Sequence, residues 1–351
     1  MYLYYQSIFS KTTKEAGNIN NCWVVITSIN PPNPRVYEFL KLGYQLVVVG
    51  DTTTNNSEWE NISNNSLHYL SIDKQDNLFP ELSKLIGYKT YARKNFGYLY
   101  AVLNGAEEIF DTDDDTFIRA EAISLFENIE KCTFYEVNGG ESFNPYLFFA
   151  ENSGIWPRGY PLRLVSSARW HLENEQTIVE SNKNLNIDIL QTLVNLEPDV
   201  DAIYRLTVSD AIQNFSISKS ILNINSPILT PGNTQSTIWL NKKKFKYLYI
   251  PRWVSFRFCD ILKMYIAQKN SHLSYAGFWT EQIRNAHDYL EDFESEITCY
   301  LHTEMVIKYL NNSNKTNLSE IYSDLTKLGV ANESEVETSL MFENLVSKLM
   351  P

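Results

Sequence analysis

Hydrophobic residues form short runs over the first 115 positions, and these runs alternate between the spacing of strands and that of helices. Residues 23–29 and 45–49 are continuous apolar runs, which are typical of buried parallel strands. A Pro-rich loop at 30–34 follows the first run, and a short helix is expected over 35–42. A strand, a helix and a strand in this order predict a right-handed βαβ unit.

The next apolar residues recur at helical spacing and lead into another strand. The positions i, i+3, i+4 and i+7 are occupied by Phe96, Leu99, Tyr100 and Leu103. This pattern predicts an amphipathic helix that ends at Gly105. A third strand is expected at 67–72, and a short apolar strand at 108–110 follows the helix. The first 115 residues therefore predict an α/β sheet with room for a nucleotide at its open edge.

The remainder of the chain has a weaker pattern. Short strands are expected at 133–137 and 247–250, among polar loops. Near the C-terminus an apolar helical face is marked by Phe342, Leu345, Val346 and Leu349. Residues 334–337 read as a capping box before that helix. We expect one large domain over 1–302 and a helical extension over 303–351 that packs on the core or forms a homodimer contact.

Composition excludes several classes of protein. The 351 residues carry a net charge of −12, which argues against nucleic acid or an anionic membrane as a partner. A phosphorylated ligand would need local cations or a metal ion. The four cysteines form no CxxC pair, and reduced thiols predict a cytoplasmic protein. No run of about 18 apolar residues occurs, so no membrane span is expected.

The densest chemical feature is the acidic run from Asp111 to Asp115, which follows the strand at 108–110. Four carboxylates in five residues repel one another unless a cation lies among them. A divalent ion, Mn²⁺ or Mg²⁺, would remove this repulsion and share its other positions with substrate phosphates. We expect Asp113 and Asp115 on the metal, with Asp111 and Asp114 facing the nucleotide sugar. If the chain already turns here, Asp111 and Asp113 are the equivalent pair, and the sequence does not fix which register applies. A solvated acidic turn is the alternative.

Other residues near predicted strand ends fit a nucleotide. The segment 89–95 holds three cations at a helix start, and Arg93, Lys94 and Asn95 are expected to bind phosphate. Asp51 follows the second strand, where a carboxylate can bind ribose or base, although a turn-stabilising role is as plausible. Thr27, at the end of the first strand, completes this expected donor site.

Three further segments are candidates for the acceptor side. Arg158 lies in a loop stiffened by two prolines and two aromatic residues, where it could bind phosphate or carboxylate. Asp199 and Asp201 could supply a general base for an attacking hydroxyl. His287 could complete a metal shell. Each of these residues could equally be structural.

The quoted segments together resemble the STELLO family of glycosyltransferase-like proteins. The matching stretches cover most of 22–296 in the expected order, and they are 91–100, 109–115, 156–161, 198–207, 255–261 and 282–290. The resemblance implies a GT-A-like fold, a Rossmann-type mixed sheet flanked by helices, with a metal site for a nucleotide-activated sugar. The nucleotide-sugar part is then expected at about 20–165 and the acceptor part at about 166–302. Plant members carry a membrane anchor, and the expected absence of a span here is a departure from them.

The piece from Arg158 to Pro161 is also similar to reversibly glycosylated polypeptides, which are UDP-arabinopyranose mutases. In that family the arginine of this motif is thought to accept the sugar. The sequence thus leaves three hypotheses open: a metal-dependent glycosyltransferase using a UDP-sugar and a glycan or other hydroxyl acceptor, a mutase glycosylated at Arg158, or a non-catalytic binding scaffold. We favour the first.

Overall fold

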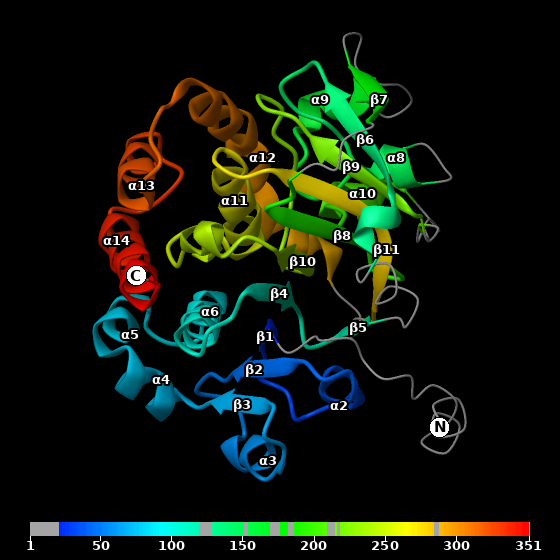
Figure 1. Ribbon diagram of the computed structural model, residues 1–351. Coiled ribbons are helices and arrows are strands. Elements are labelled where there is room, and N and C mark those ends of the chain that lie inside the picture. Colours follow the sequence, from blue (N-terminus) through cyan, green and yellow to red (C-terminus); the bar gives the residue numbers. More distant parts are fainter. Residues whose placement is uncertain are drawn as a thin grey trace.

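The computed structural model (Figure 1) describes residues 21–118, 128–150, 154–168, 176–181, 186–208, 215, 218–283 and 288–350. Within these residues eleven strands form one mixed sheet, in the order β3-β2-β1-β4-β10-β8-β11-β9-β6-β7, and β5 pairs with β11. The strands are β1 Cys22–Thr27, β2 Gln45–Val49, β3 Leu67–Leu70, β4 Glu108–Thr112, β5 Thr116–Ile118, β6 Thr133–Asn138, β7 Thr177–Ser181, β8 Ile189–Asn195, β9 Ser220–Ile224, β10 Ser236–Trp239 and β11 Leu273–Gln282.

The helical elements lie on both faces of the sheet and at its side (Figure 1). They are α2 Pro34–Lys41, α3 Asn56–Glu60, α4 Ile72–Leu78, α5 Pro80–Ile86, η2 Tyr91–Arg93, α6 Lys94–Leu103, η3 Ile129–Lys131, α8 Tyr146–Phe149, α9 Leu162–Ala168, α10 Ala202–Thr207, η4 Lys242–Leu248, α11 Phe256–Gln268, α12 Tyr289–Asn312, α13 Leu318–Lys327 and α14 Ser334–Leu349.

The first four strands confirm the predicted βαβ organisation. β3, β2, β1 and β4 are neighbours and pair in parallel, so their carboxyl ends meet at one edge of the sheet. β10 then pairs with β4 in the antiparallel direction. The expected fold class, a Rossmann-type mixed sheet flanked by helices with a helical C-terminal region, is therefore confirmed.

Alternation along β1 and β2 explains how the sheet is covered. Val25 and Val47 belong to one hydrophobic core with residues of α6, whereas Val24 and Leu46 belong to a second core with residues of α2. Successive side chains of a strand point to opposite faces, so a continuous apolar run is buried on both. Gly97 lets α6 approach closely, because a Cβ there would lie 2.6 Å from Val25 Cγ1.

The C-terminal helices pack on the main body. α14 contacts α5, α6 and η4, and Figure 1 shows it beside α5. The division expected after residue 302 falls inside α12. The expected capping box is wrong, because Ser334 is already helical and its N–H bonds to Asn332 Oδ1. A homodimer contact through these helices stays a prediction.

The strand expected at 247–250 is also wrong. Residues 242–248 form the 3₁₀ helix η4, and Phe245 and Leu248 are both fully buried in the same core. Short apolar runs do not distinguish strand from helix by periodicity alone. Here two residues three positions apart face the core, which is a helical spacing.

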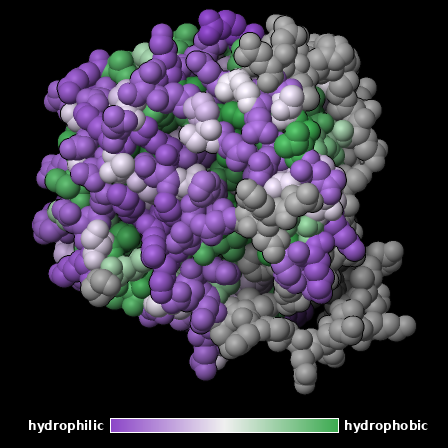
Figure 2. Space-filling view, turned by 45° about the horizontal axis from the view of Figure 1, so that its top comes forward, coloured by the Kyte–Doolittle hydropathy of each residue, from purple (hydrophilic) through white to green (hydrophobic). Residues whose placement is uncertain are grey.

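The molecular surface in Figure 2 is mainly hydrophilic, with hydrophobic residues in small groups. Among the described residues, no helix is both long and apolar enough to cross a membrane.

Candidate functional site

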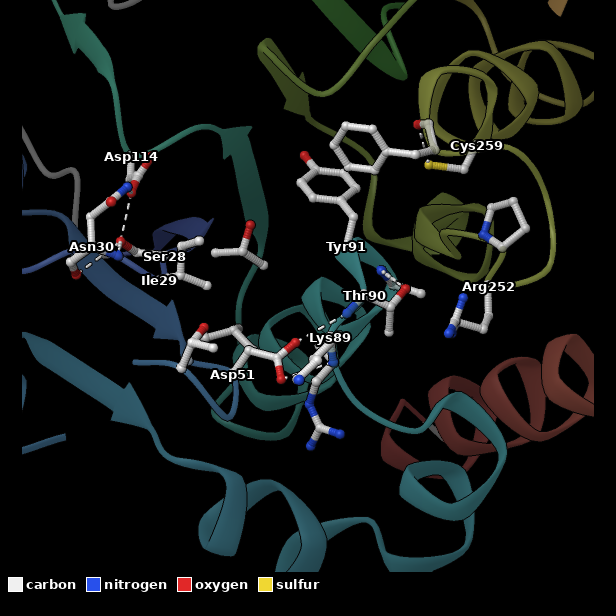
Figure 3. Close-up of a pocket in the computed structure, with 18 of the residues that line it drawn as sticks. Ser28, Ile29, Asn30, Asp51, Lys89, Thr90, Tyr91, Asp114, Arg252 and Cys259 are labelled. Carbon is white, nitrogen blue, oxygen red and sulfur yellow. Dashed lines mark hydrogen bonds between the residues drawn. The ribbon is translucent and has the colours of Figure 1, made fainter. Parts of the chain in front are cut away.

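A cavity of about 570 Å³ lies at the carboxyl ends of β1 and β2. Its lining comprises Thr27, Ser28, Ile29, Asn30, Val49, Gly50, Asp51, Thr53, Lys89, Thr90, Tyr91, Ala92, Arg93, Asp114, Pro251, Arg252, Val254, Phe256 and Cys259. Figure 3 shows Ser28, Asn30 and Asp114 on one side and Tyr91 and Arg252 on the other. We call the side formed by residues 27–30 and 49–51 the strand wall, and the side formed by residues 250–256 the loop wall.

Asp114 ties the strand wall to the acidic segment. Its Oδ2 accepts hydrogen bonds from Ser28 Oγ at 2.6 Å and Asn30 Nδ2 at 3.1 Å. The backbone carbonyl of Asp114 accepts another from Asn33 Nδ2 at 2.8 Å. Asp114 therefore lines the cavity, while its carboxylate fixes the loop after β1 (Figure 3).

Asp51 has a similar double role. Its Oδ1 accepts from the backbone N–H of Thr52 at 2.6 Å and of Lys89 at 3.0 Å, and its Oδ2 accepts from Thr90 N–H at 3.1 Å. A carboxylate offers about four acceptor positions, so one remains for a ligand hydroxyl. The bonds to residues 89 and 90 also place the exposed Lys89 side chain on the cavity.

The cations at the helix start point inward, which differs from the expected phosphate contacts. Arg93 is 1% exposed and its guanidinium bonds to Gln75 Oε1, Gly87 O and Asp76. Arg93 lines the cavity, but protein acceptors occupy its three guanidinium nitrogens. Of the segment 89–95, Lys89 is the cation with an exposed side chain.

Asn95 anchors the loop wall and does not face the cavity. Its Nδ2 donates to Ile250 O at 2.8 Å, and its Oδ1 accepts from Ile250 N–H at 2.8 Å. The side chain is fully buried. This pair of bonds mimics a strand contact, and it places the chain that leads to Arg252 on the cavity rim.

Lys94 and Asp111 belong to a buried charge cluster below the acidic segment. Lys94 Nζ lies 2.7 Å from Asp111 Oδ1, and Lys263 Nζ lies 2.6 Å from Asp111 Oδ2. All three side chains are 0% exposed. Burial lowers the pKa of Lys263, and Asp111 only partly offsets this. Asp111 was expected near the sugar, yet its carboxylate neutralises two buried lysines.

Asp113 and Asp115 are half-buried, as Asp114 is, whereas Asp111 is fully buried. Asp113 is 23% exposed, lies 3.7 Å from Lys94 Nζ and accepts a hydrogen bond from Tyr91 at 3.2 Å. Burial, followed by the charges of Asp113 and Asp111, holds the pKa of Tyr91 well above its ordinary value. Its hydroxyl therefore stays a donor. Asp115 accepts from Gln282 Nε2 at 2.5 Å.

Asp113 and Asp115 are the residues from which a metal site is expected. No group of three or more His, Cys, Asp or Glu side chains in the described part of the chain is placed to hold an ion. Mg²⁺ at a diphosphate commonly uses one or two protein carboxylates, with water and phosphate oxygens completing its shell. Asp113 and Asp115 are ligands of the right type for such a shell, although Asp114 is the residue of the acidic segment that lines the cavity. His287, the third expected ligand, lies outside the described residues.

Arg158 differs most from its expected role. Its guanidinium bonds to both oxygens of Asp199 at 2.8 and 2.9 Å, and to both of Asp260 at 3.0 and 2.7 Å. Burial would lower the pKa of Arg158, but the two carboxylates raise it well above its ordinary value. A buried, charged and doubly paired guanidinium is a poor sugar acceptor, so the geometry gives the mutase hypothesis no support.

The two expected general bases are buried in the same region. Asp199 is 3% exposed and also accepts from Asn233 Nδ2 at 2.8 Å. Asp201 is the N-cap of α10 and accepts from Trp156 Nε1 at 2.6 Å. Burial raises the pKa of Asp201 to about 7. Neither residue lines the cavity, and the general-base role expected of them stays a prediction.

Sequence reasoning missed several residues that the fold brings to the site. Lys263 and Arg252 come from the second half of the chain, and nothing near them in sequence links them to the acidic segment. Tyr91 also bonds to Thr234 Oγ1 at 2.7 Å, which joins the acidic segment to the buried loop before β10. Gln282 carried one signal, since it begins a stretch that resembles the STELLO family.

Comparison with known proteins finds similar sequences but no matching family model. Two Arabidopsis thaliana proteins, named probable glycosyltransferases STELLO1 and STELLO2, are each 27% identical, over 278 and 289 residues. The matches cover 74% and 75% of this chain but 34% and 35% of the relatives. The chain thus spans about a third of their length.

Among solved structures, a similar chain occurs in the crystal structure of S. aureus TarS 1–349 in complex with UDP-GlcNAc. The TM-score is 0.36 and the identity 9%, over 93% of this chain and 92% of that chain. The sequence matches confirm the resemblance stated above: over about three quarters of its length, this chain is similar to the STELLO glycosyltransferase-like proteins.

Proposed function

We propose that this chain is a glycosyltransferase that binds a UDP-sugar in the cavity and transfers the sugar to a hydroxyl acceptor. The observation that carries the proposal is the position of the cavity, at the carboxyl ends of two parallel strands and beside the acidic segment. Ligands of α/β sheets bind at this edge. The STELLO relatives, which are named probable glycosyltransferases, support the reaction class.

The lining suits the parts of a nucleotide diphosphate. Ile29 is 62% exposed and Phe256 64% exposed, and both can make apolar contacts with a base or sugar. Asp51 keeps one acceptor position for a ribose hydroxyl. In the described part of the chain, neither Lys89 nor Arg252 is in an ion pair, so both cations can bind phosphate oxygens.

The same residues have a role in the proposed transfer. Negative charge grows on the diphosphate as the bond to the sugar breaks, and Lys89 and Arg252 would stabilise it. Tyr91 orients Asp113 through its hydroxyl. A divalent ion held by Asp113, Asp115 and the diphosphate would add positive charge at the leaving group. We infer Mn²⁺ or Mg²⁺ as that ion.

Calorimetry with UDP tests the donor site. UDP should bind the wild-type protein in Mn²⁺, more weakly in EDTA, and roughly fivefold to tenfold more weakly to Lys89→Ala, because a phosphate-binding cation is lost. Lys348→Ala is the matched control, since Lys348 is an exposed lysine at the end of α14. Equal affinity in all three proteins would contradict the proposed site.

Incubation with a labelled UDP-sugar separates the remaining hypotheses. Transfer to an added acceptor or to water supports the transferase. Tight binding without turnover would support a non-catalytic scaffold. A sugar adduct on Arg158, mapped by peptide mass spectrometry, would restore the mutase.

A further inference from the structure

The loop wall carries Arg252, yet other parts of the chain hold it in place. Asn95 of α6 binds the backbone of Ile250, and Arg252 Nε donates to Ile86 O at 3.1 Å. Ser255 Oγ donates to Ser295 O of α12 at 2.5 Å. Residues 250–255 form no regular helix or strand, so these side-chain bonds fix their course.

The C-terminal helix α14 supplies the central anchor. Glu335, in its first turn, accepts hydrogen bonds from the backbone N–H of Trp253 and from the Tyr249 hydroxyl. These bonds hold the chain on both sides of Arg252. Glu335 itself is 0% exposed.

A carboxylate at this place is costly, which argues that it does more than fill space. Burial raises the pKa of Glu335 to about 7, and hydrogen bonds from Tyr249 and Trp253, with the charge of Arg252, only partly offset this. No ion pair is formed by Glu335 in the part of the chain that the structure describes. An apolar residue would pack more cheaply in the core.

Glu343 of the same helix provides an internal comparison. Its two oxygens accept from Lys246 Nζ at 3.0 Å and from Leu318 N–H at 2.9 Å. Glu343 therefore fastens α14 to η4 and α13, away from the cavity. Glu335 instead accepts hydrogen bonds from Tyr249 and Trp253, which lie on either side of Arg252.

We propose that Glu335 is a positioning residue of the donor site, through which α14 sets the place of Arg252 against the diphosphate of the nucleotide sugar. This inference rests on the proposed function, because it assigns Arg252 to the diphosphate. It makes the C-terminal helical region part of the donor site, although that region contributes no side chain to the cavity lining.

The test compares the binding of UDP with the binding of uridine by five variants in Mn²⁺. Arg252→Ala should weaken UDP binding about tenfold and leave uridine binding within about twofold, because a guanidinium acts on phosphate. Glu335→Gln should weaken UDP binding roughly threefold to tenfold with the same preference, since the amide keeps the size but not both acceptors. The double variant should lose no more than Arg252→Ala alone, because the two changes act on one contact.

Glu343→Gln is the control for a general effect of α14. It should lower thermal stability as much as Glu335→Gln or more, with unchanged affinity for UDP. Tyr249→Phe offers a milder second variant, because it removes one bond to Glu335 and keeps the Trp253 bond. It should reduce UDP affinity by about twofold or threefold.

The outcomes separate the inference from the proposed function. If UDP does not bind the wild-type protein, both fail. If UDP binds and Arg252→Ala weakens it, but Glu335→Gln and Tyr249→Phe bind like the wild type, the inference alone is overturned. Equal losses of affinity for UDP and for uridine in Glu335→Gln would also overturn the inference, and so would additive losses of UDP affinity in the double variant. In either case Glu335 would act on the fold and not through Arg252.

Discussion

The two walls of the cavity are built in different ways. The strand wall consists of the ends of β1 and β2, which backbone pairing holds within the sheet. The loop wall has no such pairing, and side chains of α6 and α14 together with a backbone carbonyl of α12 hold it. The strand wall is therefore part of the stable core, whereas changes at single side chains can move the loop wall while the protein stays folded.

The largest expected effect lies beneath the strand wall. Asp111→Asn removes the carboxylate between two fully buried lysines, and uncompensated buried charge costs about 3–5 kcal/mol of unfolding free energy. Urea denaturation measures this. Asp113→Asn, a partly exposed neighbour, should change stability by less than about 1 kcal/mol and reduce metal-dependent UDP binding. Similar destabilisation by both variants would show that the two aspartates share one environment.

A second effect, of about 3 kcal/mol for each group, concerns pH and two buried acids that lie away from the strand wall. Burial raises the pKa values of Glu335 and Asp201 to about 7. Between about pH 4 and 7 the unfolded chain releases these protons and the folded protein keeps them, so stability falls as pH rises. Unfolding by urea should require less denaturant at pH 8 than at pH 5.

The variant Glu335→Gln isolates one of these acids. It should remove part of the fall in stability between pH 5 and pH 8. A hydrogen bond from Lys315 lowers the pKa of Asp324 to about 2. Asp324 therefore changes the pH dependence of stability only below this window. A pH profile unchanged by Glu335→Gln would mean that Glu335 ionises in the folded protein as it does in the unfolded chain.

A smaller effect is expected where the loop wall begins. Asn95→Ala leaves the buried N–H and C=O of Ile250 without partners, which costs about 2 kcal/mol. It should also weaken UDP binding, because the segment carrying Arg252 loses an anchor. Asn104→Ala, at the exposed end of the same helix, is the control and should change neither property. If Asn95→Ala lowers stability alone, the loop wall does not depend on this anchor.

This difference also explains what the sequence could predict. The strand wall follows from local patterns: apolar runs at 23–29 and 45–49 predicted β1 and β2, and the edge position of Asp51 followed from them. The position of Asp113 and Asp115 beyond β4 was equally local. The loop wall depends on contacts between distant positions: Asn95 lies 155 positions from Ile250, Glu335 lies 82 from Trp253, and Ile86 lies 166 from Arg252. No periodicity encodes such contacts.

The errors at Arg93, Lys94 and Asn95 have a related cause. A cation or amide at a helix start can bind a ligand or face the core, and the local sequence is the same in both cases. Here Gln75, Asp111 and the backbone of Ile250 occupy their polar atoms. Arg158, Asp199 and Asp260 likewise pair across 41 and 102 positions, so their burial was not visible from the sequence.

A crystal structure with UDP and Mn²⁺ tests the central claim most directly. The account predicts UDP in the cavity, with its diphosphate between Lys89 and Arg252, its ribose at Asp51, and an anomalous manganese signal beside Asp113 and Asp115. UDP bound elsewhere on the molecule, or a diphosphate that contacts neither Lys89 nor Arg252, would contradict it.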